Sequence, residues 1–185
     1  VGAYTGAGVF LPLYLVEVRG ESTTAAGLVL SIGGVMWTCG SVFASLRAGR
    51  WPMRLALLGA LLLVLACVSI AAQSALGNLP LALIYVTWGA AGMGVGLALL
   101  HLMNWAIAFS PPAHSGAVSG AVQTMRMLGG AAFGALMGAV LNAIGTDPDH
   151  LRTSITAIFG LTAILALFPM TIGRPKIEPR DLPTE

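Results

Sequence analysis

The chain has 185 residues, of which 57% are hydrophobic and only 9% are charged, and its mean hydropathy is +0.88. Soluble domains carry about 25% charged residues, so this composition excludes an ordinary soluble domain and indicates an all-α protein embedded in the lipid bilayer. The formal net charge is +2, and no basic patch is interleaved with aromatic side chains, so nucleic acid is not an expected partner.

The sequence divides into six apolar segments, and a helix needs about 20 apolar residues to cross the hydrocarbon core. We predict that they form one bundle, followed by a disordered cytoplasmic tail at residues 173–185. The first segment is short, contains Pro12 and begins at once with Val1, so we expect a piece of a longer protein, cut at its N-terminal side. The predicted spans are residues 1–16, 25–46, 55–73, 81–109, 116–144 and 153–172.

The second segment carries a row of small polar side chains. Residues 22–24 are Ser, Thr and Thr, and we expect one of them to cap this helix. Ser31, Thr38, Ser41 and Ser45 follow at spacings of seven, three and four, which places them in one stripe. In lipid such a stripe should face other helices or a cavity, so Thr38 is a candidate cavity residue.

A basic loop separates the second and third segments. It contains Arg47, Arg50 and Arg54, and Pro52 is expected to break the helix there. Basic loops remain in the cytoplasm, and a cytoplasmic start of the first segment places six Lys and Arg residues inside and two outside. We therefore predict a multi-pass protein of the inner cell membrane with both ends of this segment cytoplasmic.

The fourth segment combines glycines with two polar side chains. Gly92 and Gly96 form a small-xxx-small pair, which is typical of close helix packing in membranes. His101 and Asn104 lie one turn apart and share a face. A histidine inside a span is either a proton relay or a hydrogen-bonded structural residue, and the sequence favours the structural role without excluding the relay.

The fifth segment, residues 116–145, contains a single charge, Arg126. Ten residues of helix rise roughly 15 Å, which places this cation near the bilayer midplane, where it costs about 2.5–3.5 kcal/mol. Ser119, Gln123 and Gly130 share its helix face. We interpret this face as part of a substrate cavity; a structural tie to backbone carbonyls or another helix is the alternative, and both remain open.

Beyond the arginine, glycine recurs every fourth residue at Gly130, Gly134 and Gly138. This ladder allows close approach of another helix, so we predict a packing surface. The tryptophans are expected to be interface anchors or core residues, not a cation-binding box; they are Trp37, Trp51, Trp88 and Trp105.

No chemistry of an enzyme is indicated. Cys39 and Cys67 fall within apolar runs and are expected to be reduced packing residues. No Cys/His spacing suits a metal, and no nucleophile–base or acid pair suggests hydrolysis. We therefore expect neither a metal nor another cofactor, and we find no carboxylate well inside any segment.

The basic loop resembles a motif of the major facilitator superfamily. Arg47, Gly49, Arg50 and Arg54 match the weakened second copy of the superfamily's loop motif, which lies between the second and third helices of the C-terminal half. The full form has an acidic residue before the basic run, and that residue is absent here.

Two further stretches resemble one branch of this superfamily, the drug:proton antiporters with fourteen spans. PLYLVEVRG at residues 12–20, followed by AGL at 26–28, is similar to the entry to the last six helices. SGAVSG at residues 115–120, followed by Gln123, Arg126 and LGG at 128–130, is similar to the penultimate helix. The resemblance implies the C-terminal six-helix half of an efflux carrier whose proton-coupling acids lie in the missing N-terminal half.

The resulting hypothesis is a half-transporter whose six spans form two groups of three. Paired with its N-terminal half, it would export small amphipathic compounds in exchange for protons by alternating access, with Arg126, Gln123, Ser119, His101, Asn104 and Thr38 contributing to the cavity. The alternative is a six-span membrane subunit or scaffold that does not transport and assembles through its glycine-rich faces.

Overall fold

The computed structural model describes residues 2–47, 52–77, 80–108, 110–145 and 147–171. These residues form six α-helices with two short helical turns between them, a π-helical segment η1 and a 3-10 segment η2. The predicted tail and two residues of the loop motif, Gly49 and Arg50, lie outside the described residues. The elements are α1 Gly2–Leu13, η1 Tyr14–Val18, α2 Thr23–Leu46, α3 Pro52–Leu76, α4 Leu81–Ala108, η2 Pro112–His114, α5 Ser115–Ile144 and α6 Pro148–Thr171.

The predicted fold class is confirmed. Within the described ranges, five helices are long and apolar enough to cross a membrane, namely α2 to α6, and Tyr4–Val18 adds a shorter apolar helix. The shorter one joins α1 to η1, where the N–H of Arg19 donates to the carbonyl oxygen of Tyr14 at 3.2 Å. This five-residue step is the wider hydrogen-bond pattern of a π turn, and it begins two residues after Pro12, which has no N–H to donate.

Local signals at the helix starts explain most of the boundaries. The Ser22 Oγ accepts from the N–H of Ala25 at 3.1 Å, so the predicted cap is confirmed. Pro52 does not interrupt a helix but begins α3, and Pro148 begins α6. A proline suits the first helical position because its N–H would have no partner there. The predicted start of the sixth span at residue 153 is therefore wrong, since α6 starts five residues earlier.

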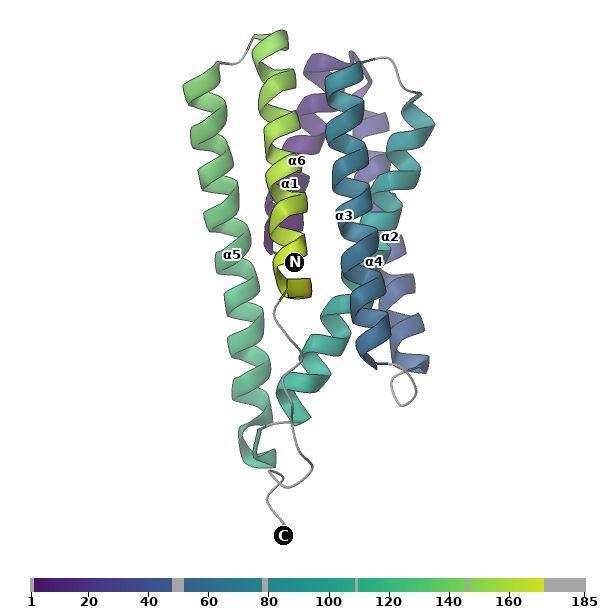
Figure 1. Ribbon diagram of the computed structural model, residues 1–185, viewed down its shortest axis with the longest axis vertical. Helices are drawn as coiled ribbons and strands as arrows, with labels where there is room; N and C mark the ends of the chain where they lie inside the picture. The colour runs from purple at the N-terminus through teal and green to yellow at the C-terminus, as the bar shows by residue number, and fades with distance from the viewer. Residues whose placement is uncertain (1, 48–51, 78–79, 109, 146, 172–185) are drawn as a thin grey trace.

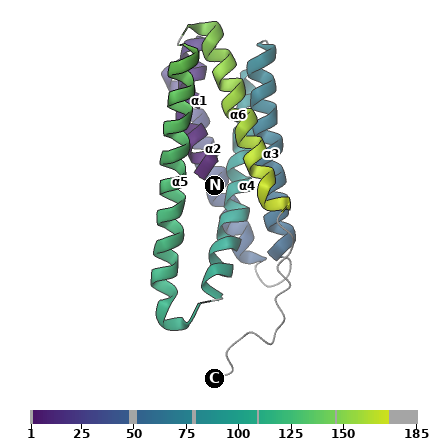
Figure 2. The same cartoon turned by 60° about the vertical axis from the view of Figure 1, so that its left-hand side comes forward.

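The helices pair in an interleaved order. In the chain's main contacts, α4 packs against α2 and α3, α3 packs against α6, and α1 packs against α5. The predicted two groups of three do not form separate packing units, because these strongest pairings, α2/α4, α3/α4, α3/α6 and α1/α5, all join a helix of the first three to a helix of the last three. Both views show α5 at one edge of the bundle, with α3 toward the other side (Figures 1 and 2).

Glycines allow α2 and α4 to touch backbone to backbone. A Cβ added at Gly92 would collide with the carbonyl oxygen of Gly33, and one added at Gly96 would collide with that of Trp37. In the opposite direction, a Cβ at Gly40 would collide with the carbonyl oxygen of Met93. A carbonyl fixed in a helix cannot swing aside, so these positions need glycine for the observed helix spacing. The predicted packing pair Gly92 and Gly96 thus lies at the closest approach of two helices.

An aromatic cluster fills the centre of the bundle. The rings of Tyr4 and Trp88 stack with centroids 4.6 Å apart and an interplanar angle of 19°, and Phe159 meets Trp88 edge-on at 6.3 Å. All three side chains are buried. Gly33 makes room for this stack, because a Cβ there would lie 2.5 Å from Trp88 Nε1. The cluster joins α1, α4 and α6 and fixes the position of α1, which is the shorter apolar helix.

Candidate functional site

The contact between α1 and α5 is close only in part. A Cβ added at Gly2 would lie 2.9 Å from the carbonyl carbon of Gly129, and one at Gly6 would lie 3.0 Å from the carbonyl oxygen of Gly130. By contrast, a Cβ added at Gly134 or at Gly138 would meet nothing within 4 Å. Within the described chain, the predicted glycine ladder therefore lies against α1 at Gly130 and at Gly134, whose backbone nitrogen would also lie 3.0 Å from a Cβ at Gly6. The packing role of Gly138 stays a prediction.

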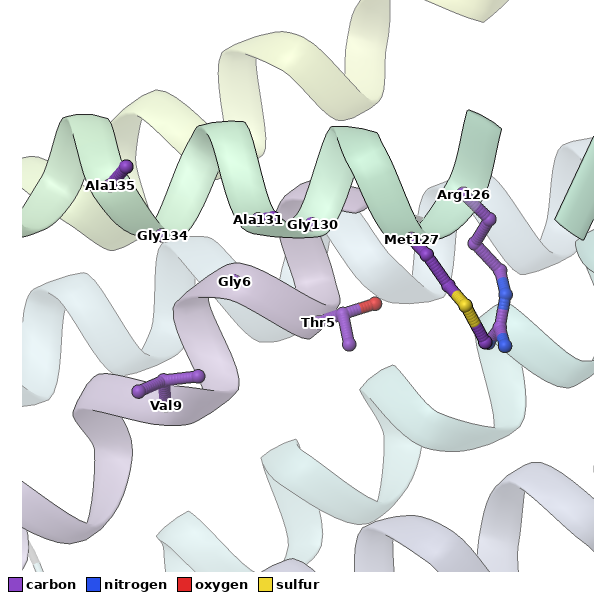
Figure 3. Close-up of a pocket in the computed structure, with 9 residues that line it drawn as sticks. All are labelled: Thr5, Gly6, Val9, Arg126, Met127, Gly130, Ala131, Gly134 and Ala135. Atoms are coloured by element: carbon purple, nitrogen blue, oxygen red, sulfur yellow. The ribbon is translucent and has the colours of Figure 1, made fainter. Parts of the chain in front are cut away.

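A groove of about 420 Å³ lies between these two helices. Figure 3 shows that Arg126 and Met127 extend from α5 together at one end, while small residues follow along the helix and α1 supplies the facing wall. The groove is apolar except for Arg126 and Thr5. Its lining residues are Thr5, Gly6 and Val9 of α1 and Arg126, Met127, Gly130, Ala131, Gly134 and Ala135 of α5.

Arg126 is half-buried, and its Nε atom is buried without a hydrogen-bond partner in the described part of the chain. The guanidinium carbon lies over the ring of Trp37 on α2, 5.6 Å from the ring centroid. A cation above a tryptophan face gains about 0.5–2 kcal/mol, more when water is excluded. The contact holds the charge in place between α5 and α2 but supplies no hydrogen-bond acceptor for the buried Nε.

Trp37 is itself tied to the aromatic core. Its ring meets Tyr4 edge-on, with centroids 5.9 Å apart and an interplanar angle of 69°. Tyr4 in turn stacks on Trp88, so a chain of ring contacts runs from the guanidinium of Arg126 to Phe159. These ring contacts connect α5, α2, α1, α4 and α6 in that order. The guanidinium of Arg126 is thus connected through ring contacts to five of the six helices.

None of the described carboxylates forms an ion pair with Arg126. Within the described ranges, an ion pair joins Asp147 to His150 at 3.5 Å, between the start of α6 and the residue before it. Glu17 and Glu21 lie near the end of η1. An arginine in a span normally has a partner, so the partner of Arg126 is expected from outside the described residues.

The other predicted cavity residues on α4 and α5 lie outside the lining of the α1/α5 groove. Ser119 and Gln123 are half-buried like Arg126, in agreement with a shared helix face. His101 is half-buried on α4, and Asn104 is exposed. Among the described residues, none of these four lines the α1/α5 groove, whereas Arg126 does.

The polar stripe of α2 is exposed at Ser31, Thr38 and Ser45. The hydroxyls of Ser31 and Thr38 donate to the carbonyl oxygens of Gly27 and Gly34, at 2.9 and 3.1 Å. Such bonds to the preceding turn satisfy the hydroxyl donors inside the helix. Thr38 can therefore lie against lipid, a partner helix or a cavity, and it does not line the groove.

The basic loop is described only at its ends. Arg47 is exposed, and its guanidinium carbon lies 5.2 Å from the centroid of the Phe43 ring. Arg54 is exposed in the first turn of α3. The structure thus places both arginines at helix ends on the two sides of this loop, as expected for residues that anchor spans at the membrane surface.

Sequence reasoning missed the part that α1 and Trp37 play. Trp88 is buried core, as predicted, but Trp37 holds a cation, which was not predicted. Gly2 and Gly6 are four residues apart, the same small-xxx-small spacing that was recognised in the fifth segment. That spacing could have identified α1 as the partner of α5. No cluster of three or more His, Cys, Asp or Glu side chains suited to a metal occurs among the described residues.

Six apolar helices, five of them long enough to span a bilayer, and an interior arginine at a groove define a polytopic helical membrane protein. Residues 1–134 match the Major Facilitator Superfamily, and the chain belongs to this family. The chain is 31% identical over 159 residues to a protein of Escherichia coli K12 named as the uncharacterized transporter YebQ. The match covers 84% of this chain and 34% of YebQ, so the chain spans about a third of that relative. No solved structure matches the chain.

Proposed function

We propose that this chain is the C-terminal half of a secondary transporter that exports small amphipathic compounds in exchange for protons. The observation that carries the proposal is the half-buried Arg126, whose guanidinium lies over Trp37 and whose buried Nε has no hydrogen-bond partner among the described residues of this superfamily bundle. Placing such a cation within a span is costly, and it is typical of substrate or ion pathways. The relative that is named a transporter supports the same class.

The open face favours a second bundle as the partner. Only 11% of the α5 span and 22% of the α2 span are buried, against 50% for α4. Arg126 and Trp37 belong to these two least covered spans and meet each other there. In this superfamily two six-helix halves rock about a site near the membrane midplane. We place the missing N-terminal half over α2 and α5, with the site between the halves.

Proton coupling and drug export rest on the resemblance of residues 12–28 and 115–130 to the fourteen-span drug:proton antiporters. The described spans carry no acid near Arg126, so the titrating carboxylates of such a carrier would lie in the other half. In the proposed topology both ends of this segment face the cytoplasm in the inner membrane, as the arginines on either side of the basic loop favour.

The test uses the complete transporter in cells that lack their major efflux pumps. We expect cells producing it to expel preloaded ethidium, a cation, or anilinonaphthalene sulfonate, an anion, and a protonophore to stop the expulsion. Cells carrying the empty vector provide the baseline. Export of neither dye above this baseline, or export that the protonophore leaves unchanged, would contradict proton-coupled efflux of amphipathic compounds.

Topology is tested separately. In a background with Cys39 and Cys67 replaced by alanine, Arg47→Cys and Leu76→Cys should react with an impermeant thiol reagent from opposite sides. Arg47 follows α2 and Leu76 ends α3, so one full span lies between them. Labelling of both cysteines in intact cells from outside would disprove the proposed orientation.

A further inference from the structure

The groove between α1 and α5 has the features of a ligand site and not of a simple helix contact. Its volume of about 420 Å³ lies within the range of about 300–1,000 Å³ that small-molecule pockets occupy. Gly130, Ala131, Gly134 and Ala135 leave its α5 side without bulky side chains (Figure 3). A helix with its side chains is about 10–12 Å across, so a helix of the other half would lie over this groove without filling it.

Charge is confined to one end of the groove. Arg126 lines that end, and the other lining residues are uncharged. The distance along α5 from Arg126 to Ala135 corresponds to roughly 14 Å of helix rise, which gives a narrow apolar path leading away from a cation. One face of the guanidinium is covered by Trp37, while its Nε has no acceptor within the described chain. A ligand that completes the site therefore needs an anionic head and a slender apolar body.

We propose that the α1/α5 groove binds a single-chain amphipathic anion, with its carboxylate or comparable head at Arg126 and its tail along residues 130–135. This inference rests on the proposed transport function and names the substrate class for it. The head supplies the negative charge that no described carboxylate gives Arg126, and the tail covers the small residues of α5, among them Gly134, where an added Cβ would meet nothing within 4 Å. A charged head without a tail would leave that surface uncovered.

The test is photolabelling of the purified complete transporter in phosphatidylcholine nanodiscs. The probe is dodecanoate carrying a diazirine on its chain, and the matched probes are the corresponding dodecanol and dodecyltrimethylammonium. We expect the carboxylate probe to label the peptides that contain residues 5–9 and 127–135, about ten-fold or more above either matched probe. Equal labelling by the three probes would overturn the anionic requirement.

Two variants and a control locate the site. Arg126→Gln should lower labelling of these peptides by the carboxylate probe about ten-fold or more, because one charge-assisted hydrogen bond is lost. Gly134→Leu should lower it similarly by filling the groove. Gly138→Leu has the same open surroundings but lies outside the groove lining, so it should label as wild type. Equal labelling of the Gly134→Leu and Gly138→Leu proteins would show that the probe binds elsewhere.

Two further results would each overturn the proposal and identify another occupant of the groove. Loss of labelling when phosphatidylglycerol is added to the nanodiscs would assign the groove to a two-chain membrane lipid and overturn the single-chain proposal. Aggregation of both leucine variants of the complete transporter would show that a helix of the other half fills the groove and does not merely lie over it, which also overturns the proposal. Labelling is measured without transport, so a failure of the binding proposal is separate from a failure of dye export.

Discussion

The α2/α4 and α1/α5 pairs are both rich in glycine, yet they are packed differently. In the α2/α4 pair, glycines on both helices face the partner's backbone oxygens. In the α1/α5 pair, close approach occurs at Gly2 and Gly6, and a groove of about 420 Å³ lies beside them. Each superfamily half contains two inverted repeats of three helices. Exchanging the two repeats relates α2 to α5 and α4 to α1, so the α2/α4 pair corresponds to the α5/α1 pair.

This correspondence suggests how one scaffold supports two tasks. In lipid, helices gain little from apolar contact alone, so close backbone packing is a main source of association. The closed α2/α4 pair provides that association. The α1/α5 pair gives up part of it and holds an interior cation beside an apolar groove instead. On the proposed function, the first pair serves mainly structure and the second would serve mainly ligand binding.

The largest expected effect is at the closed pair. Gly92→Leu places side-chain atoms against the carbonyl oxygen of Gly33, and neither backbone can yield without separating α2 from α4. We expect a destabilisation beyond the ~1–3 kcal/mol of ordinary overpacking, and hence loss of the monodisperse peak in size-exclusion chromatography of the complete protein. Gly160→Leu on α6, where an added Cβ meets nothing within 4 Å, is the control and should keep that peak.

Gly6→Ala should have an intermediate effect. The new Cβ would lie 2.8 Å from Cδ1 of Phe133, which can rotate, and 3.0 Å from the carbonyl oxygen of Gly130, which cannot. We expect a loss of ~1–3 kcal/mol, seen as a lowered thermal midpoint but with folded protein retained. A midpoint equal to wild type would show that α1 is free to move away from α5. The α1/α5 interface would then not be divided into a close contact at Gly6 and a groove beside it.

Gly138→Ala should have the smallest effect. Its Cβ enters open space, and alanine is favoured over glycine within a helix by about 1 kcal/mol. The thermal midpoint should therefore remain the same or rise slightly. A fall as large as that of Gly6→Ala would indicate that this part of α5 is packed against another part of the complete protein, as the glycine ladder first suggested.

Much of this fold follows from sequence pattern. The apolar segments predict six helices because backbone polar groups in lipid must be satisfied within the segment. Ser22 as a cap follows from its side-chain acceptor. The starts of α3 and α6 were misplaced because a proline both ends one helix and begins another, and the sequence alone does not show which.

The candidate site was predicted only in part. Arg126 was identifiable because a lone charge in a long apolar run has few harmless explanations. Its partner Trp37 was not, since residues 89 positions apart meet only through the packing of α5 near α2. The same limit applies to the glycines, because Gly92 and Gly134 both belong to small-xxx-small patterns. Only the position of the neighbouring helix makes Gly92 face a carbonyl oxygen and Gly134 face a groove.

The central claim is that Arg126 serves transport and does not hold the bundle together. The most direct measurement compares the folded amount of the complete transporter with its export of anilinonaphthalene sulfonate, for wild type and Arg126→Gln side by side. We predict an unchanged folded amount and export per molecule reduced about ten-fold or more, the effect of one lost charge-assisted hydrogen bond. A reduced folded amount with unchanged export per molecule would contradict this claim and make Arg126 a structural residue.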